Sequence, residues 1–140
     1  MLLHIIARGK IGRSSEAELV DRYLARIAWL TRITELPDQG GKLPASLSPA
    51  VTIVLDEKGP PLPSMRFAEK LGRWRDDGMR EARFLIGAAD GFEETDRQAA
   101  DLILGFGAMT WPHLLARAML AEQLFRATSI LAGHPYHREG

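Results

Sequence analysis

The sequence has no cysteine, no long apolar run and no excess of charge of either sign. Its 140 residues include 18 basic and 18 acidic side chains, so the net charge is zero with the four histidines neutral. The absence of cysteine excludes disulfides and thiolate chemistry, and it favours a cytoplasmic protein. No apolar stretch approaches the roughly 20 residues that a membrane helix needs, so we expect no membrane contact. The opening MLLHIIARGK does not match a signal peptide, because its apolar stretch is short and its basic residues follow it.

The neutral charge balance argues against a protein that coats nucleic acid by charge alone. A local basic face is compatible with it, because steering depends on how the charges are distributed. Arg8, Lys10 and Arg13 cluster directly after the first apolar run, and they are the best candidates for phosphate contacts.

Apolar runs and helical spacings alternate along the chain. We expect strands at 2–7, 33–36, 51–55, 83–86 and 101–106, and helices at 15–30, 64–77, 93–100 and from Pro112 to about Ala132. The segment 37–49, PDQGGKLPASLSP, holds three prolines and two adjacent glycines, so it is expected to be a surface loop. This order predicts a single α/β domain over residues 1–140, with a mostly parallel sheet flanked by helices.

In such sheets, ligands bind beyond the carboxyl ends of the strands. That rule selects three loops, 56–59, 87–91 and 107–112. The GAADG stretch at 87–91 is a poor match to a dinucleotide loop or a P-loop, and plain turn chemistry explains it as well. The three loops together could form one crevice.

The helix after Pro112 is apolar on more than one side, which implies either deep burial or a partner subunit. Glu122 and Arg126 on this helix are spaced as an i, i+4 ion pair. His134 and His137 form H-x-x-H, but Pro135 lies between them and no third ligand is evident, so we expect no metal.

The final third of the chain carries the most specific pattern. Thr110-Trp111-Pro112-His113, Ala121 to Ala127 (AEQLFRA) and His134 to Glu139 (HPYHRE) resemble the C-terminal signature of the RlmH family, which are SPOUT-class methyltransferases. Val54-Leu55-Asp56, Phe84 to Gly91 and Gly9-Lys10 fit the earlier motifs of that family, so the resemblance covers essentially the whole chain.

The resemblance implies a homodimeric α/β fold with a C-terminal trefoil knot that binds S-adenosylmethionine. It also implies methylation of N3 of a pseudouridine in 23S ribosomal RNA, on assembled ribosomes. Carried over by position, the cofactor-binding residues are Leu55, Gly87, Gly91, Phe106, Gly107, Ala108, Met109, Thr110 and Trp111, while His134, Tyr136, His137 and Arg138 face the target base.

The chain departs from the family pattern at three places. Ala88 and Ala89 stand where the family has a glycine and a proline, Phe125 replaces a tyrosine, and the segment 37–49 is short where many relatives carry a basic helix. These changes leave an alternative open, a non-catalytic dimeric protein that binds the ribosome and has lost the cofactor.

Among the tail residues, His137 is the predicted proton acceptor, because a histidine can take the N3 proton near neutral pH. Arg138 is predicted to stabilise charge on the ring carbonyls, and Tyr136 to stack on or orient the base. These three residues are the predicted catalytic set.

Overall fold

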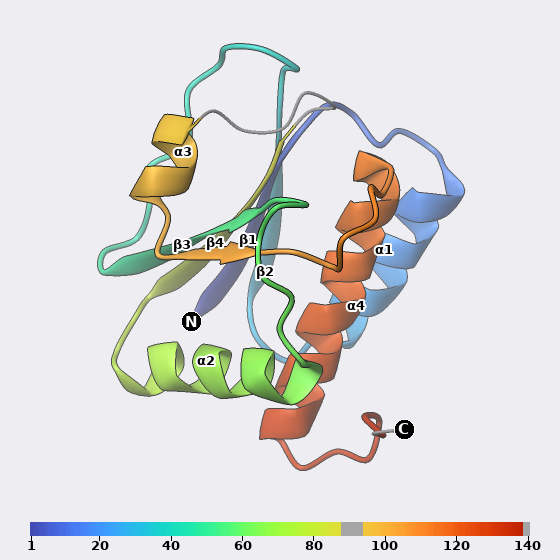
Figure 1. Ribbon diagram of the computed structural model, residues 1–140. Coiled ribbons are helices and arrows are strands. Elements are labelled where there is room, and N and C mark those ends of the chain that lie inside the picture. Colours follow the sequence, from blue (N-terminus) through green and yellow to red (C-terminus); the bar gives the residue numbers. More distant parts are fainter. Residues whose placement is uncertain (88–93, 139–140) are drawn as a thin grey trace.

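The computed structural model describes residues 1–87 and 94–138, and strands and helices follow one another there in the predicted order (Figure 1). The strands are β1 (Leu2–Arg8), β2 (Thr31–Leu36), β3 (Ala50–Leu55), β4 (Glu81–Ile86) and β5 (Leu102–Leu104). The helices are α1 (Ser15–Arg26), α2 (Ser64–Asp76), α3 (Glu94–Ala99) and α4 (His113–Leu131). The strands form one sheet in the order β2-β1-β4-β3-β5, and every pair is parallel. The predicted α/β class is confirmed, whereas the trefoil knot stays a prediction.

One face of the sheet holds the main core. Alternate residues of the central strands point to it, among them Ile5 of β1, Phe84 of β4 and Ile53 of β3, all of which are fully buried. Phe67 and Leu71 of α2 and Leu124 of α4 pack against them. Helices α1, α2 and α4 lie on this side, and α3 lies on the other (Figure 1), as right-handed crossovers require.

The opposite face is polar where the segment 37–49 covers it. Nδ1 of His4 lies 2.9 Å from the Glu81 carboxylate, and Nε2 lies 2.7 Å from the hydroxyl of Thr34. Arg83 forms an ion pair with the same carboxylate and donates to the carbonyl of Pro44. The loop is irregular, as predicted, and these buried groups hold it against the sheet.

The first helix is shorter than predicted. It ends at Arg26 instead of Leu30, and β2 begins at Thr31 instead of Ile33. Leu30, which was predicted as the last residue of that helix, is 76% exposed. Its carbonyl accepts a hydrogen bond from the N–H of Leu3, so pairing with β1 draws the chain out of the helix there. A non-local sheet contact has overridden the local periodicity.

The apolar excess on the last helix is explained largely within the chain. Leu120 and Leu124 of α4 face the sheet, and Ala118 and Ala121 pack against Val20 of α1. The sequence left two explanations for this apolar surface, deep burial and a partner subunit. Burial within the chain accounts for most of it, so the apolar surface of α4 is not evidence for a homodimer.

Among the described residues, no helix is both long and apolar enough to cross a bilayer, including α4 with its 19 residues.

Candidate active site

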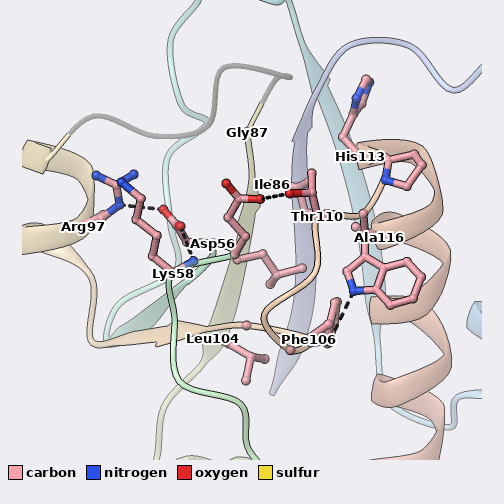
Figure 2. Close-up of a pocket in the computed structure, with 16 residues that line it drawn as sticks. Asp56, Lys58, Ile86, Gly87, Arg97, Leu104, Phe106, Thr110, His113 and Ala116 are labelled. Atoms are coloured by element: carbon pink, nitrogen blue, oxygen red, sulfur yellow. Dashed lines mark hydrogen bonds and ion pairs between the residues drawn. The ribbon is translucent and has the colours of Figure 1, made fainter.

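Residues of two strand-end loops selected from the sequence, 56–59 and 107–112, line one cavity of about 570 Å³ together with Gly87, the first residue of the third loop. The rest of that third loop lies outside the described residues. The walls of the cavity come from the ends of β3, β4 and β5, from the loop that follows β5, and from the first turn of α4 (Figure 2). Parallel strands bring their carboxyl ends to one edge of the sheet, so loops distant in sequence become neighbours there. The volume lies in the range of small-molecule sites.

Asp56 forms the charged side of the cavity. Its carboxylate accepts hydrogen bonds from Nε of Arg97 at 2.6 Å and from the backbone N–H of Lys58 at 2.8 Å (Figure 2). Burial by itself would raise the pKa of Asp56, but these donors and the positive charge of Arg97 outweigh it and leave the pKa below its usual value. Asp56 is therefore an ionised acceptor at neutral pH.

One side chain ties the loop after β5 to the rest of the site, and another closes the loop on itself. The hydroxyl of Thr110 donates to Glu57 at 2.8 Å, and the indole N–H of Trp111 donates to the carbonyl of Phe106 at 3.3 Å (Figure 2). Met109, at the tip of the loop, is 76% exposed. The loop thus closes on itself while its inner side faces the cavity.

The structure brings together most of the sequence-predicted cofactor residues. Those that line the cavity are Leu55, Gly87, Phe106, Gly107, Thr110 and Trp111. Ala108 and Met109 belong to the same loop but do not line it, and Gly91 lies outside the described residues.

Several lining residues were not among the predicted cofactor-binding residues. Asp56 belongs to the selected loop 56–59 and His113 to a quoted motif, and both positions are signals that could have identified them. Arg97 carried none, because α3 brings it to the cavity from a stretch without a motif.

The predicted catalytic residues lie elsewhere in the same chain. The tail, of which the structure describes residues 132–138, follows the far end of α4 (Figure 1). Phe125, against which Tyr136 packs at 4.6 Å between ring centroids, lies nine residues after the cavity residue Ala116. Nine residues are about two and a half helical turns, so these positions are on opposite sides of α4. The tail and the cavity of one chain therefore do not form one site.

The tail folds back on its own helix through a polar cluster. Arg126 forms an ion pair with Glu122 at 2.6 Å, which confirms the predicted i, i+4 pair. Its guanidinium also lies 4.8 Å from the ring of Tyr136. Burial raises the pKa of Tyr136, and the charge of Glu122 and the neighbouring Tyr23 add to the rise, so the phenol stays protonated at neutral pH.

Two other sequence features have a plain place in the fold. Arg8 donates to the carbonyls of Pro37 and Gly40, so it fastens the loop, and phosphate binding by the Arg8–Arg13 cluster stays a prediction. His134 is exposed. Within residues 1–87 and 94–138, no three histidine or acidic side chains are grouped as metal ligands would be.

Comparison with known proteins identifies the family. A protein-family model described as "Predicted SPOUT methyltransferase" matches residues 1–137 of the chain. The chain is also 74% identical over 140 residues to a protein of Rhizorhabdus wittichii named ribosomal RNA large subunit methyltransferase H, with both chains fully covered. The chain belongs to the RlmH family of SPOUT methyltransferases. A protein of the same name from Novosphingobium aromaticivorans is 69% identical, again over the full length of both.

More distant members of the family match along the whole chain as well. The protein of this name from Rhodospirillum centenum is 42% identical over 151 aligned residues, with 99% of each chain covered. Among solved structures, a probable methyltransferase from Bordetella pertussis superposes with a TM-score of 0.58 at 12% identity, covering 91% of this chain and 95% of that one. At that identity the likeness concerns the fold alone, and it agrees with the SPOUT assignment.

Gly105 is expected to be irreplaceable at the floor of the cavity. A Cβ there would lie 2.3 Å from the carbonyl oxygen of Gly59, a backbone atom that cannot yield. We expect Gly105→Ala to lower the free energy of unfolding by about 1–3 kcal/mol, as overpacking does. Denaturant titration measures this change.

The control is Gly12→Ala, because Gly12 has a φ of +60° but no atom within 4 Å of its Cβ position. Gly12→Ala introduces backbone strain, worth about 1–2 kcal/mol, without a clash, whereas Gly105→Ala introduces a clash at a residue without a positive φ. A Gly105→Ala protein as stable as wild type would contradict the close approach.

Proposed function

We propose that this protein transfers a methyl group from S-adenosylmethionine to N3 of a pseudouridine in 23S ribosomal RNA, acting on assembled ribosomes. The proposal rests on one observation above all: residues of the predicted loops 56–59 and 107–112 and Gly87 line one cavity, in a chain 74% identical to a ribosomal RNA large subunit methyltransferase. The type of reaction follows from the family, and the RNA from the names of its members.

The residues of the cavity fit the methyl donor. The nucleoside of the donor needs apolar walls, and Leu55, Ile86 and Phe106 supply them. Its hydroxyl and amino groups need acceptors, and its sulfonium is cationic. Glu57 and Asp56 are carboxylates at the same cavity, and the glycines at 87 and 107 leave backbone groups accessible. When bound, the cofactor supplies an electrophilic methyl group.

The tail is proposed to supply the substrate side. Arg138 is exposed and always protonated, so it suits a phosphate or a ring carbonyl that gains negative charge. Tyr136 and His137 lie beside it, half-buried against α4. Because the tail and the cavity of one chain lie on opposite sides of α4, we propose that the tail serves the cavity of a partner subunit in a homodimer.

The reaction needs positioning more than it needs acid or base groups. The cavity would hold the methyl group in line with N3, and the tail would hold the ring, so that a bimolecular encounter becomes a step within one complex. The N3 proton must leave before or during the transfer. The groups of the tail that can respond to that charge are His137 and Arg138.

The proposed function is tested by mass spectrometry of ribosomal RNA from cells with and without the gene. We expect one methylated pseudouridine of 23S RNA to disappear without the gene, and purified protein with S-adenosylmethionine to restore it on isolated ribosomes. Calorimetry should show cofactor binding. Unchanged RNA together with no heat of cofactor binding would indicate the alternative, a non-catalytic protein that binds the ribosome. Cofactor binding together with a different methylated product would indicate another RNA substrate.

A further inference from the structure

An ion pair between Arg97 and Asp56 forms part of the cavity wall (Figure 2). Nε of Arg97 on α3 lies 2.6 Å from Oδ2 of Asp56, the residue that follows β3. The side chain of Asp56 is 5% exposed and that of Arg97 is 20% exposed. A carboxylate buried to this extent needs a cationic or hydrogen-bonding partner, because an unpaired buried charge is costly. Arg97 is the cation that meets this need.

The carboxylate of Asp56 still has room for a ligand. An ionised carboxylate offers about four lone-pair sites. In the described part of the chain, Arg97 occupies one site on Oδ2, and the backbone N–H of Lys58 occupies one on Oδ1, at 2.8 Å. Each oxygen therefore keeps one further site, and Asp56 lines the cavity. A molecule bound in the cavity can donate hydrogen bonds to it.

Arg97 fixes both the direction and the charge of this carboxylate. Its guanidinium is planar, and besides the contact of Nε its Nη1 lies 3.4 Å from Glu94 on the same helix. These two contacts restrict how the guanidinium can turn, and the bond from Nε then restricts the carboxylate. Burial alone would raise the pKa of Asp56, but the N–H of Lys58 and the guanidinium of Arg97 outweigh it. Asp56 is therefore held ionised and oriented at neutral pH.

We propose that Arg97 is a positioning residue for the cofactor, holding Asp56 as the acceptor of hydrogen bonds from the cofactor's ribose hydroxyls or from its ammonium group. Hydrogen bonds to an ionised acceptor are shorter and stronger than those between neutral groups, so either group would bind well to this carboxylate. The inference rests on the proposed function, because it takes S-adenosylmethionine as the ligand of the cavity. It gives a role to a residue that lies outside the motifs of the sequence.

Calorimetry with S-adenosylhomocysteine, the product form of the cofactor, tests this role without turnover. We expect Arg97→Met to weaken binding about tenfold or more at neutral pH, the range expected when a hydrogen bond to a charged group is lost. Arg97→Lys should restore most of the affinity, because a lysine ammonium can also reach and pair with the Asp56 carboxylate. Thermal unfolding checks that the variants fold, and Arg97→Gln replaces Arg97→Met if methionine is not tolerated.

A double variant separates positioning from direct contact with the ligand. Asp56→Asn removes the charge of the acceptor and should weaken binding at least as much as Arg97→Met. If Arg97 acts through Asp56, the double variant Asp56→Asn/Arg97→Met should bind no more weakly than Asp56→Asn alone. Losses that add would show that Arg97 contacts the ligand independently, and they would overturn the positioning role.

Methylthioadenosine identifies which group of the cofactor donates to Asp56. This ligand keeps the ribose hydroxyls but has no ammonium group. A loss of affinity for both ligands in Arg97→Met would support the hydroxyls as the partners of Asp56. A loss for S-adenosylhomocysteine alone would support the ammonium group.

The matched control is Arg75→Met. Nε of Arg75 also pairs with a carboxylate, that of Asp76 at 3.0 Å, but both residues belong to α2 and neither lines the cavity. Its affinity for S-adenosylhomocysteine should equal that of the wild type. Unchanged binding in Arg97→Met would contradict the inference alone, whereas a wild type that binds no cofactor would contradict the proposed function as well.

Discussion

Co-expressing His137→Ala chains with Ala116→Trp chains is expected to restore methylation that neither variant has alone. Ala116 lines the cavity from α4, so a bulky indole there should exclude the cofactor (Figure 2). His137→Ala leaves the cavity intact but removes the group proposed to contact the base. Each variant alone should lose about 10²-fold or more in turnover.

The recovery follows from the separation of tail and cavity within one chain. If each site combines the cavity of one subunit with the tail of the other, a mixed dimer holds one site with both parts intact. Random pairing makes half of the dimers mixed, so about a quarter of wild-type activity per chain should return. Calorimetry should confirm that only Ala116→Trp loses the cofactor, and thermal unfolding should confirm that both variants fold.

The opposite outcome would be equally informative. Were each site built from one chain, every site in the mixture would carry one defect or the other, and no activity would return. A fully active monomer at high dilution would also refute the shared site.

Glu81→Gln is expected to be the most destabilising single change of a charged side chain. Glu81 is 1% exposed. Its carboxylate accepts a hydrogen bond from the N–H of Leu47 at 3.0 Å, forms an ion pair with Arg83 at 2.9 Å and contacts the His4 ring. Removing its charge leaves Arg83 buried without a counter-ion. Breaking a buried pair in this way costs about 3–5 kcal/mol. Denaturant titration at neutral pH measures the loss.

The matched control is Glu69→Gln. Glu69 pairs with Arg66 at 2.8 Å, but both side chains are more than half exposed. Such pairs contribute about 0–1 kcal/mol. Equal losses for the two variants would show that burial does not determine the strength of the Glu81 cluster.

The effect of Glu81 should also depend on pH. Burial by itself would raise the pKa of Glu81, but the N–H of Leu47, His4 and Arg83 outweigh it and leave the pKa below the ordinary value of 4.5. A carboxylate with a lowered folded-state pKa stabilises the protein above its unfolded-state pKa, and this contribution is lost as the pH falls through the folded-state value. The difference between wild type and Glu81→Gln should therefore shrink below about pH 4.5.

The same cluster shows where prediction from the sequence stopped. The strand at β4 was expected to begin at Arg83, yet it begins at Glu81, two residues earlier. In the sequence, a glutamate and an arginine before an apolar run look like exposed residues that precede the strand, because unpaired charged side chains are rarely buried. Their mutual pairing, with His4 from a strand far away in sequence, is what makes burial possible.

The tail illustrates the same limit at the candidate site. Its residues were identified from the sequence as a functional motif, and His137 was chosen as a base from the ordinary chemistry of histidine. Its surroundings depend on Arg126, eleven residues earlier, whose Nη1 lies 3.0 Å from Nδ1 of His137, and on how the tail folds back onto α4. Only the i, i+4 spacing of Glu122 and Arg126 could be read locally.

The sequence by itself determined the order of strands and helices, the parallel α/β class, the loops 56–59 and 107–112 at the site, and the family. These follow from local periodicity, from the rule that parallel strands present their carboxyl ends together, and from contiguous motifs. The tertiary structure decided where α1 ends, that α1 covers the second side of α4, which charges are buried, and that tail and cavity lie on opposite sides of one helix. Those features depend on contacts between residues far apart in the chain, whose energies outweigh the local preferences that a sequence displays.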